Sequence, residues 1–389
     1  MTQRLPTSAR IDPLGTFLAV VGCAALVLLP FVVFKANRIM PGETRSLLEV
    51  LPTGLALGFD AALLVVAATA VGVTSARVRL VVGLLGVVAV ALAIAAAANA
   101  LTPPANRIVR ISPGPGFWIL LVAIGLMSTD AIARLRPGPG QRVLLLALFG
   151  AIVAAAFHYG LFDHLSIMRE YAVNASRFAR EARQHVLLAL GSLTAAVIVA
   201  LPLGIFCHRV PRVRAAILQT LNLIQTIPSI ALFGILMVPL GAIATRFPLT
   251  AEWGVSGIGA APAVIALFLY SLLPVVANTV VGLGRVPAET VDAARGMGLT
   301  DLQVLTQIEL PLAVPVILTG IRIVLVQNIG LVTIAALIGG GGFGTFVFQG
   351  MGQTAIDLVL LGAIPTVVLA FCSAVLLDAL VDVMKRAPR

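Results

Sequence analysis

The sequence predicts an all-α polytopic membrane protein with about ten transmembrane helices, and three observations lead to this prediction. The 389-residue chain is 60% hydrophobic and only 11% charged, whereas soluble domains carry about 25% charged residues. It contains ten apolar runs near the roughly 20 residues that cross the hydrocarbon core of a bilayer. The formal net charge of +10 is spread over short loops between those runs. This is typical of topological signals beside anionic lipid, and it disfavours nucleic acid as a partner.

The ten expected spans follow one another along the chain. They cover residues 15–34, 55–73, 80–101, 117–133, 143–162, 186–207, 216–240, 261–283, 313–335 and 358–377. The first run is longer than the apolar region of a signal peptide and no cleavage pattern follows it, so we retain it as a span. Ten spans place both termini on one side. The excess of Lys and Arg in the loops on that side, including Arg77, Arg79 and Arg209, predicts cytoplasmic termini.

The chain is expected to form two domains of about five spans each. Spans in residues 1–180 are rich in Ala, Val and Leu and read as an additional membrane domain. Spans in residues 181–389 hold more Gln, Asn, Thr, Gly and Pro. Polar groups at membrane depth are costly unless they face protein or a water-filled path, so the second domain is expected to carry the function. The polar segment 163–185 between the two sets is expected to lie outside the membrane.

Polar residues in the second domain are candidates for a transport path. Pro228 breaks its helix, and a broken helix is tolerated in a membrane only where protein or water satisfies the freed carbonyl groups. The candidate path residues are Asn222, Gln225, Thr226, Ser229, Asn278, Arg322, Gln327 and Asn328. They line a path or form hydrogen bonds that hold helices together, and both interpretations stay open. For Arg322, reaching the membrane surface or pairing with an acid near Glu309 is favoured.

Enzymatic and cofactor chemistry find no support in the sequence. The glycine-rich run 339–344 is not followed by Lys-Ser or Lys-Thr, and no Walker motif occurs, so we interpret the run as a bend with close backbone packing. The three cysteines lie in or at the end of apolar runs and match no metal or redox spacing. We therefore expect no catalytic residue, no metal site and no cofactor in this chain.

A polar loop at 284–312 carries the most specific pattern. Asp292-Ala293-Ala294 is followed by Gly298 and then by Ile308-Glu309-Leu310-Pro311. This resembles the EAA loop of ABC-importer permeases, E-A-A-x(3)-G-x(9)-I-x-L-P, with Asp in place of the first Glu. The segments 201–206, 221–236, 266–283, 294–322 and 328–350 further resemble the osmoprotectant permeases for glycine betaine, carnitine and choline. The extended form is most similar to the longer YehY-type permeases.

The resemblance implies a permease subunit whose C-terminal five helices form a type I importer (MetI-like) core. It implies that the loop forms a short cytoplasmic helix that docks on a separate ABC ATPase, which uses the ATP. The implied coupling residues are Glu289, Asp292, Ala293, Ala294, Arg295, Gly298, Ile308, Leu310 and Pro311. Other implied partners are a periplasmic or lipid-anchored solute-binding protein, a second permease subunit and membrane lipid, in a bacterial inner (plasma) membrane.

Two alternatives remain at this point. One is an ABC permease for an amino acid such as methionine, whose coupling loop would look similar. The other is a secondary transporter without an ATPase. That class favours inverted half-repeats with broken helices, and no repeat between the two halves is evident in the sequence.

Overall fold

The computed structural model of this protein describes residues 12–38, 40–103, 106, 108–252 and 254–386. Within these residues, nine helices are long and apolar enough to cross a membrane. The described chain divides into two compact units. The N-terminal unit holds Met1–Gly138 and Leu148–Ala172, and the C-terminal unit holds Pro139–Ala147 and Val173–Arg389.

The first expected span, 15–34, is shorter than predicted. Helix α1 covers Pro13–Leu28, and strand β1 follows at Val32–Lys35. Leu29 precedes Pro30, a position that disfavours helical backbone, and its backbone is extended. The β-branched Val32 and Val33 then favour a strand. This is why nine rather than ten helices reach a spanning length.

A small antiparallel sheet, absent from the predictions, lies in the N-terminal unit. Its strand order is β2–β1–β3, with β2 at Glu43–Arg45 and β3 at Arg110–Pro113. Val32 of β1 is paired with Arg45 on one side and with Pro113 on the other. Helix α2, Leu47–Val50, follows the sheet and begins at Ser46 with a capping box completed by Glu49.

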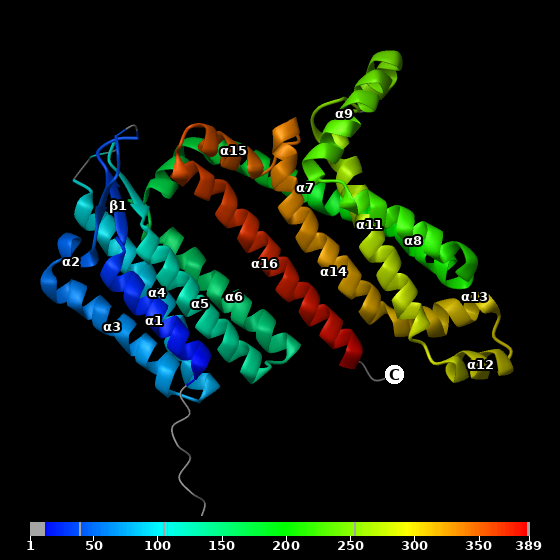
Figure 1. Cartoon of the computed structure of the whole chain (residues 1–389), viewed down its shortest axis with the longest axis horizontal. Coiled ribbons are helices and arrows are strands. Elements are labelled where there is room, and N and C mark those ends of the chain that lie inside the picture. The colour runs from blue at the N-terminus through cyan, green and yellow to red at the C-terminus, as the bar shows by residue number, and fades with distance from the viewer. Residues whose placement is uncertain (1–11, 39, 104–105, 107, 253, 387–389) are drawn as a thin grey trace, which may run out of the picture. The chain divides into compact units, whose positions relative to one another are not determined.

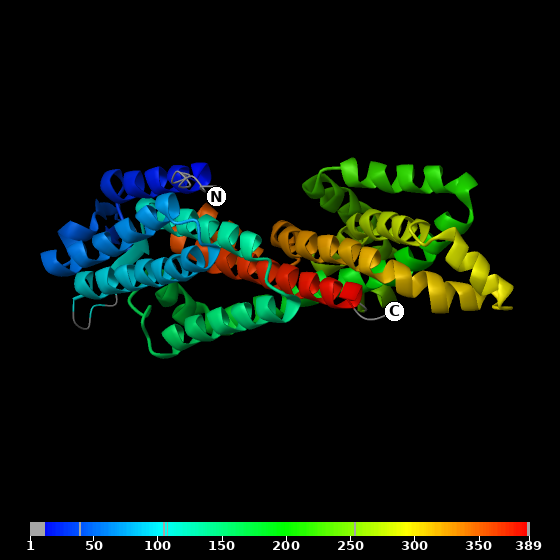
Figure 2. The ribbon, with the colours of Figure 1, turned by 90° about the horizontal axis from the view of Figure 1, so that it is seen from below.

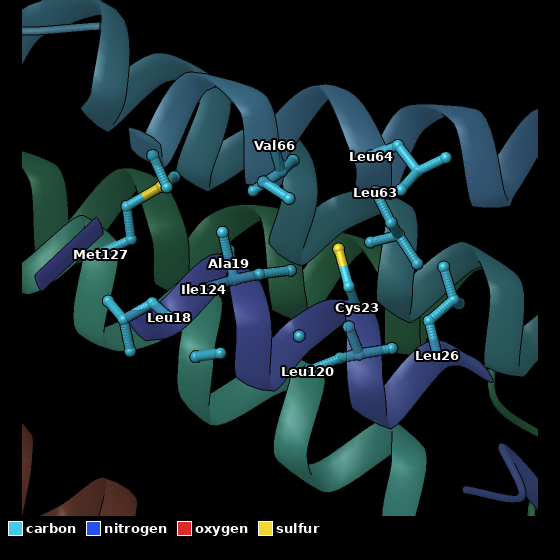
Figure 3. A pocket seen from close by; sticks show the side chains of 14 residues that line it. Leu18, Ala19, Cys23, Leu26, Leu63, Leu64, Val66, Leu120, Ile124 and Met127 are labelled. Atoms are coloured by element: carbon cyan, nitrogen blue, oxygen red, sulfur yellow. The ribbon is translucent and has the colours of Figure 1, made fainter. Parts of the chain in front are cut away.

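The N-terminal unit is a helical layer packed through small residues. Helix α1 packs on α3 (Thr53–Gly72) and α5 (Pro115–Leu135), and α4 (Ala76–Leu101) packs on α3 and α5 (Figure 1). A Cβ atom on Gly15 would lie 1.8 Å from the carbonyl oxygen of Ala70, so glycine is required where α1 meets α3. An apolar pocket opens between α1, α3 and α5, and Leu18, Cys23 and Met127 are among its lining residues (Figure 3). This lining gives a polar solute no charged partner.

An ion cluster joins the beginning of α1 to α4 and α5. Arg79, expected in a loop, is instead fully buried in α4, and its guanidinium contacts Asp12 and lies 3.4 Å from Asp130. Arg134 lies 2.8 Å from Asp12 and 2.9 Å from Asp130. Burial raises the pKa of Asp12, but the hydrogen bond and charge of Arg79 outweigh it, so that this pKa is lowered.

The C-terminal unit is built on long helices. Its main elements are α7 (Ser166–Arg209), α8 (Pro211–Thr226), α9 (Ser229–Arg246), α11 (Ala260–Gly284), α14 (Leu310–Ala335) and α16 (Ile356–Arg386). The short helices are α10 (Pro248–Glu252), α12 (Ala288–Gly296), α13 (Asp301–Gln303) and α15 (Gly344–Gly352). Helix α14 packs against both α11 and α16 and lies beside α16 in both views (Figures 1 and 2). Leu267, Val276 and Val324 belong to the buried core.

Two of the sequence predictions concern the helix break at Pro228 and the polar segment 163–185. The helix break at Pro228 is confirmed, because α8 ends at Thr226 and α9 begins at Ser229. The polar segment 163–185 is helical from Ser166 on and belongs to α7, which runs unbroken for 44 residues, or about 66 Å. Its expected place outside the membrane stays a prediction. Residues 166–190 contain neither Gly nor Pro and are rich in Ala, Arg, Glu and Leu, which all favour helix. Helix α6, Pro139–His158, precedes this long helix.

Candidate coupling segment and polar path residues

Helix α12 ends in a geometry that requires glycine. The amide of Gly298 donates to the carbonyl of Arg295 at 2.9 Å, and the amide of Leu299 donates to the carbonyl of Ala294 at 3.2 Å. These two bonds form a Schellman motif with Gly298 at the left-handed position, where its φ is +87°. No atom lies within 4 Å of a Cβ added to Gly298. The constraint within this chain is therefore backbone conformation rather than space.

The second half of the coupling segment is held by its own cap. Thr300 caps α13 through two reciprocal hydrogen bonds with Gln303. The amide of Thr300 donates to the side-chain oxygen of Gln303 at 2.8 Å, and the amide of Gln303 donates to the hydroxyl of Thr300 at 3.4 Å. Arg295 lies 3.2 Å from Asp301, which ties α12 to α13. A π-helical segment, Val304–Glu309, continues directly into α14. Its wider turns precede Pro311, whose ring disfavours an ordinary helical turn.

One face of this segment is exposed and the other holds it in place. Ala294 and Val304 are buried, and α12 packs on the π-helical segment. What we call the docking face consists of the exposed residues Glu289, Asp292, Ala293, Met297, Gly298 and Leu302. Met297 and Leu302 are 73% and 70% exposed, although both are apolar. This combination of acids, a small residue and exposed apolar side chains suits a protein partner.

The other predicted coupling residues serve the attachment of the segment. Arg295 is exposed and paired with Asp301. Leu310 packs against the small core of Leu283, Ala313 and Ile317. Ile308 is half-buried and Pro311 is exposed. Arg295 and Leu310 thus make contacts inside the chain besides any contact with a partner.

A buried ion pair next to the coupling segment escaped the sequence analysis. The Glu309 side chain is 4% exposed and pairs with Arg209 at the end of α7. We had expected Arg209 only as a topological charge in a loop. An acid between two apolar residues, Ile308 and Leu310, is the sequence signal for Glu309, because a charge in that position requires a partner.

Tyr270 of α11 forms hydrogen bonds with residues at the helix break before Pro228. The Tyr270 hydroxyl donates to the carbonyl of Ile227, and the side-chain amide of Gln225 donates to the carbonyl of Tyr270 at 2.7 Å. The hydroxyl of Thr226 donates to the carbonyl of Leu223 at 2.7 Å. Side chains of the protein therefore donate hydrogen bonds to backbone carbonyl groups next to this break.

The side chains of the candidate path residues near this break differ in their exposure. Asn222 and Thr226 are exposed and Ser229 is half-buried. A path-lining role stays a prediction for these three residues.

The polar candidates on α11 and α14 mostly bond to protein. Asn278 donates to the carbonyl of Pro274 at 2.8 Å. Asn328 is fully buried and donates to the hydroxyls of Ser192 and Ser271, each at 3.0 Å. These bonds join α7, α11 and α14 and favour the interpretation of Asn328 as a contact between helices.

Arg322 pairs with an acid, although not with Glu309. Its guanidinium lies 2.5 Å from the carboxylate of Asp378 on α16. The two side chains are 35% and 40% exposed. Gln327 is half-buried and stays a predicted path residue. The eight path candidates thus do not gather into a single cluster of mutual contacts.

Comparison with known proteins finds two matching regions of the chain. Residues 200–387 match the family described as binding-protein-dependent transport system inner membrane component. Residues 12–168 match the ABC transporter permease YehY, N-terminal domain.

Curated relatives match the second region. The osmoprotectant import permease protein OsmW of Salmonella typhimurium is 41% identical, over 51% of this chain and 86% of that protein. The carnitine transport permease protein OpuCD of Listeria monocytogenes is 37% identical, over 53% of this chain and 86% of that protein. The glycine betaine/carnitine/choline permease protein OpuCD of Bacillus subtilis is 34% identical, over 56% and 86%.

Proposed function

We propose that this chain, which belongs to the family of binding-protein-dependent ABC-importer permeases, forms the transport path for osmoprotectants such as glycine betaine, carnitine or choline. The observation that carries the proposal is the coupling segment. The short helix α12 exposes most of the docking face and packs on the π-helical segment, which continues directly into the membrane helix α14. The names of the relatives support the solute class, because they transport carnitine, choline or glycine betaine or are described as osmoprotectant permeases.

The proposal assigns ATP hydrolysis to another chain. The sequence holds no Walker motif, and the docking face is suited to the groove of an ATPase subunit. It follows that α12 lies in the cytoplasm and that the chain crosses the inner membrane of a bacterium. The cytoplasmic position of both termini stays a prediction, because it was inferred from ten spans. A solute-binding protein on the outer side and a second permease subunit complete the importer. This chain itself uses no cofactor and contributes geometry rather than catalysis.

The contacts of the coupling segment indicate how movement reaches the membrane helices. A displacement of α12 acts on the π-helical segment on which it packs, and that segment is the beginning of α14. The Glu309–Arg209 pair passes the same displacement to α7. The Asn328 bonds then hold α7, α11 and α14 together at the middle of their length. In an alternating-access cycle, these helices would move as a group when the ATPase closes and opens.

An amino acid such as methionine is the alternative solute. It differs from a quaternary ammonium compound in offering primary ammonium hydrogens, which need hydrogen-bond acceptors. A quaternary ammonium group offers none and is recognised by aromatic faces, often on the binding protein rather than on the permease. Competition between the two solute classes in one assay separates the two proposals.

The test is uptake of radiolabelled glycine betaine into proteoliposomes that hold the complete importer, with ATPase activity measured in parallel. We expect Gly298→Asp to reduce uptake at least about tenfold while ATP hydrolysis persists, because a charge enters the docking contact. Gly298→Asn is the matched control, since Asn has nearly the same shape and tolerates a positive φ without the charge. It should lose less uptake than the Asp variant.

Three outcomes decide the proposal. Uptake lost in Gly298→Asp and largely kept in Gly298→Asn supports both the importer and the coupling role. Normal uptake by Gly298→Asp contradicts the coupling role of the docking face. Uptake of methionine, but not of glycine betaine, carnitine or choline, by the wild-type importer transfers the function to the amino-acid alternative.

A further inference from the structure

The glycine-rich run that the coupling mechanism does not use has an organised structure. Residues 339–343 connect the end of α14, through a 3-10 turn at Ala336–Ile338, to α15. Gly339, Gly341 and Gly342 have φ angles of +79°, +78° and +86°, a conformation that favours glycine. We call residues 339–343 the distal loop, because α14 separates them from the coupling segment at its other end (Figure 1).

One polar face of α7 holds the distal loop and α15. We call its four residues, Arg177, Glu181, Gln184 and His185, the clasp. Their spacing of four, three and one residues places them along one side of a helix. The side-chain amide of Gln184 donates to the carbonyl of Gly340 at 3.2 Å. Arg177 donates to the side-chain oxygen of Gln349 at 2.7 Å, and its guanidinium lies 5.3 Å from the ring centre of Phe346.

Glu181 occupies the beginning of α15 from another helix. One oxygen of its carboxylate accepts from the amide of Gly342 at 2.7 Å and from the hydroxyl of Thr345 at 3.3 Å. Free amide groups and a partial positive charge at a helix start favour an acidic partner there. Glu181 thus does for α15 what a local capping residue does elsewhere, and it ties that helix to α7.

His185 ties the distal loop to both α7 and α14. It is fully buried, and its Nδ1 lies 3.2 Å from the amide of Phe343, which is a donor. Nδ1 therefore accepts, so the ring proton sits on Nε2, which donates to the carbonyl of Ile329 at 3.0 Å. The ring also packs against Phe343, with 4.9 Å between ring centres. Both nitrogens are committed, which makes the position intolerant of an apolar substitute.

The other long helices of the unit reach the distal loop through close backbone contacts. The amide of Gly259, at the start of α11, donates to the carbonyl of Ile338 at 2.7 Å. A Cβ on Gly344 would lie 1.9 Å from the carbonyl oxygen of Thr333 in α14, and one on Gly362 of α16 would lie 2.4 Å from that of Phe343. Helices α7, α11, α14 and α16 therefore meet at this loop with little free space.

We propose that the clasp is a positioning device that fixes the distal loop as the anchor of these helices at the end remote from the ATPase. The inference rests on the proposed function, in which movement enters at the coupling segment. A bundle driven from one end transmits movement to a solute path only if its other end is held. Glu181 and His185 are the principal positioning residues, because they bond the loop backbone directly. With the clasp broken, ATP hydrolysis continues but moves less solute.

The test measures ATP hydrolysed per glycine betaine imported, in proteoliposomes with the complete importer. We expect Glu181→Ala to raise this ratio about tenfold, in line with the loss of a charged hydrogen bond. Glu181→Gln keeps an acceptor of the same length for Gly342, so its ratio should lie between the alanine variant and wild type. Arg183→Ala is the matched control, two residues away on the same helix and exposed, and its ratio should stay within about twofold of wild type.

The ratio separates positioning from mere stability. A variant that only destabilises the fold lowers uptake and hydrolysis together in proportion to the complex that remains, and such a result for both Glu181 variants would overturn the inference. A raised ratio in Glu181→Ala with partial rescue by Gln would support it. A wild-type importer that takes up no glycine betaine, carnitine or choline would refute the proposed function and this inference with it. A transporting wild type with unaltered Glu181 variants would refute the inference alone.

Discussion

The two units of this chain use buried polar groups in different ways. In its described residues, the N-terminal unit has two groups of ion pairs that each include a buried side chain. One is the cluster of Asp12, Arg79, Asp130 and Arg134, and in the other Glu170 lies 3.8 Å from both Arg38 and Arg110. The apolar pocket between α1, α3 and α5 is lined by uncharged side chains. The C-terminal unit distributes polar contacts along α7, from the clasp through Asn328 to the Glu309–Arg209 pair. The two groups of ion pairs in the N-terminal unit thus lie at two places on different helices and strands, whereas these polar contacts of the C-terminal unit are spaced along one helix, α7.

The largest expected effect tests the N-terminal cluster. Arg79→Met should lower the free energy of unfolding by about 3–5 kcal/mol, because Asp12 and Asp130, whose side chains are only 14% and 18% exposed, would keep their charges with one cation fewer. Arg134, whose side chain is 42% exposed, is the control, and Arg134→Met should cost about 1 kcal/mol or less. The stability of both variants is measured by thermal unfolding of the purified full-length protein, with limited proteolysis as the readout of unfolding. Equal losses in the two variants would show that burial does not decide the strength of this cluster.

An intermediate effect tests the contact at the middle of α7 and α14. Asn328→Ala should lower the free energy of unfolding by about 1–2 kcal/mol, because it removes bonds to two neighbouring helices. Gln327→Ala, at the next residue and only half-buried, should change stability by less than about 0.5 kcal/mol. Unfolding and uptake are measured for both variants. Loss of uptake without loss of stability in Asn328→Ala would instead favour a path-lining role.

The smallest effect concerns the partly exposed pair of α14 and α16. Arg322→Gln or Asp378→Asn alone should cost about 1 kcal/mol or less, since both side chains are more than a third exposed. If Arg322 acts through this pair, the double variant should lose less uptake than the two single losses predict. Additive losses in the cycle would indicate that Arg322 serves the solute directly. That result would also weaken the comparison between the two units, because Arg322 would then bind solute besides joining α14 to α16.

Local features of the fold were readable from the sequence where one residue type decides the backbone. Pro228 predicts the break between α8 and α9, and the break is confirmed. The EAA-like pattern locates α12, and the glycine within it has the positive φ that a helix end of this type requires. The position of Leu29 before Pro30 also predicts the early end of α1, but the continuous apolar run favoured a longer helix.

Contacts between distant residues were not readable in the same way. Arg209 and Glu309 are 100 residues apart, and His185 and Phe343 are 158 apart. Periodicity places each residue on a helix face, but it does not state which other helix covers that face. The polarity of segment 163–185 predicts a position outside the membrane, but it does not predict that four of its residues form the clasp with the distal loop and α15. A stripe of polar residues at helical spacing was the available signal, and it did not reveal its partner.

The two units are interleaved along the chain, and this limits how the gene can be divided. The chain leaves the N-terminal unit at Gly138, returns to it at Leu148 and leaves again at Ala172, in the second turn of α7. Removing everything before Val173 would discard Arg142, which pairs with Asp382 at 3.1 Å. It would also create a frayed helix start one turn before the clasp. A minimal permease that keeps the Arg142–Asp382 pair therefore needs residues 139–147 in addition to those from Val173 on.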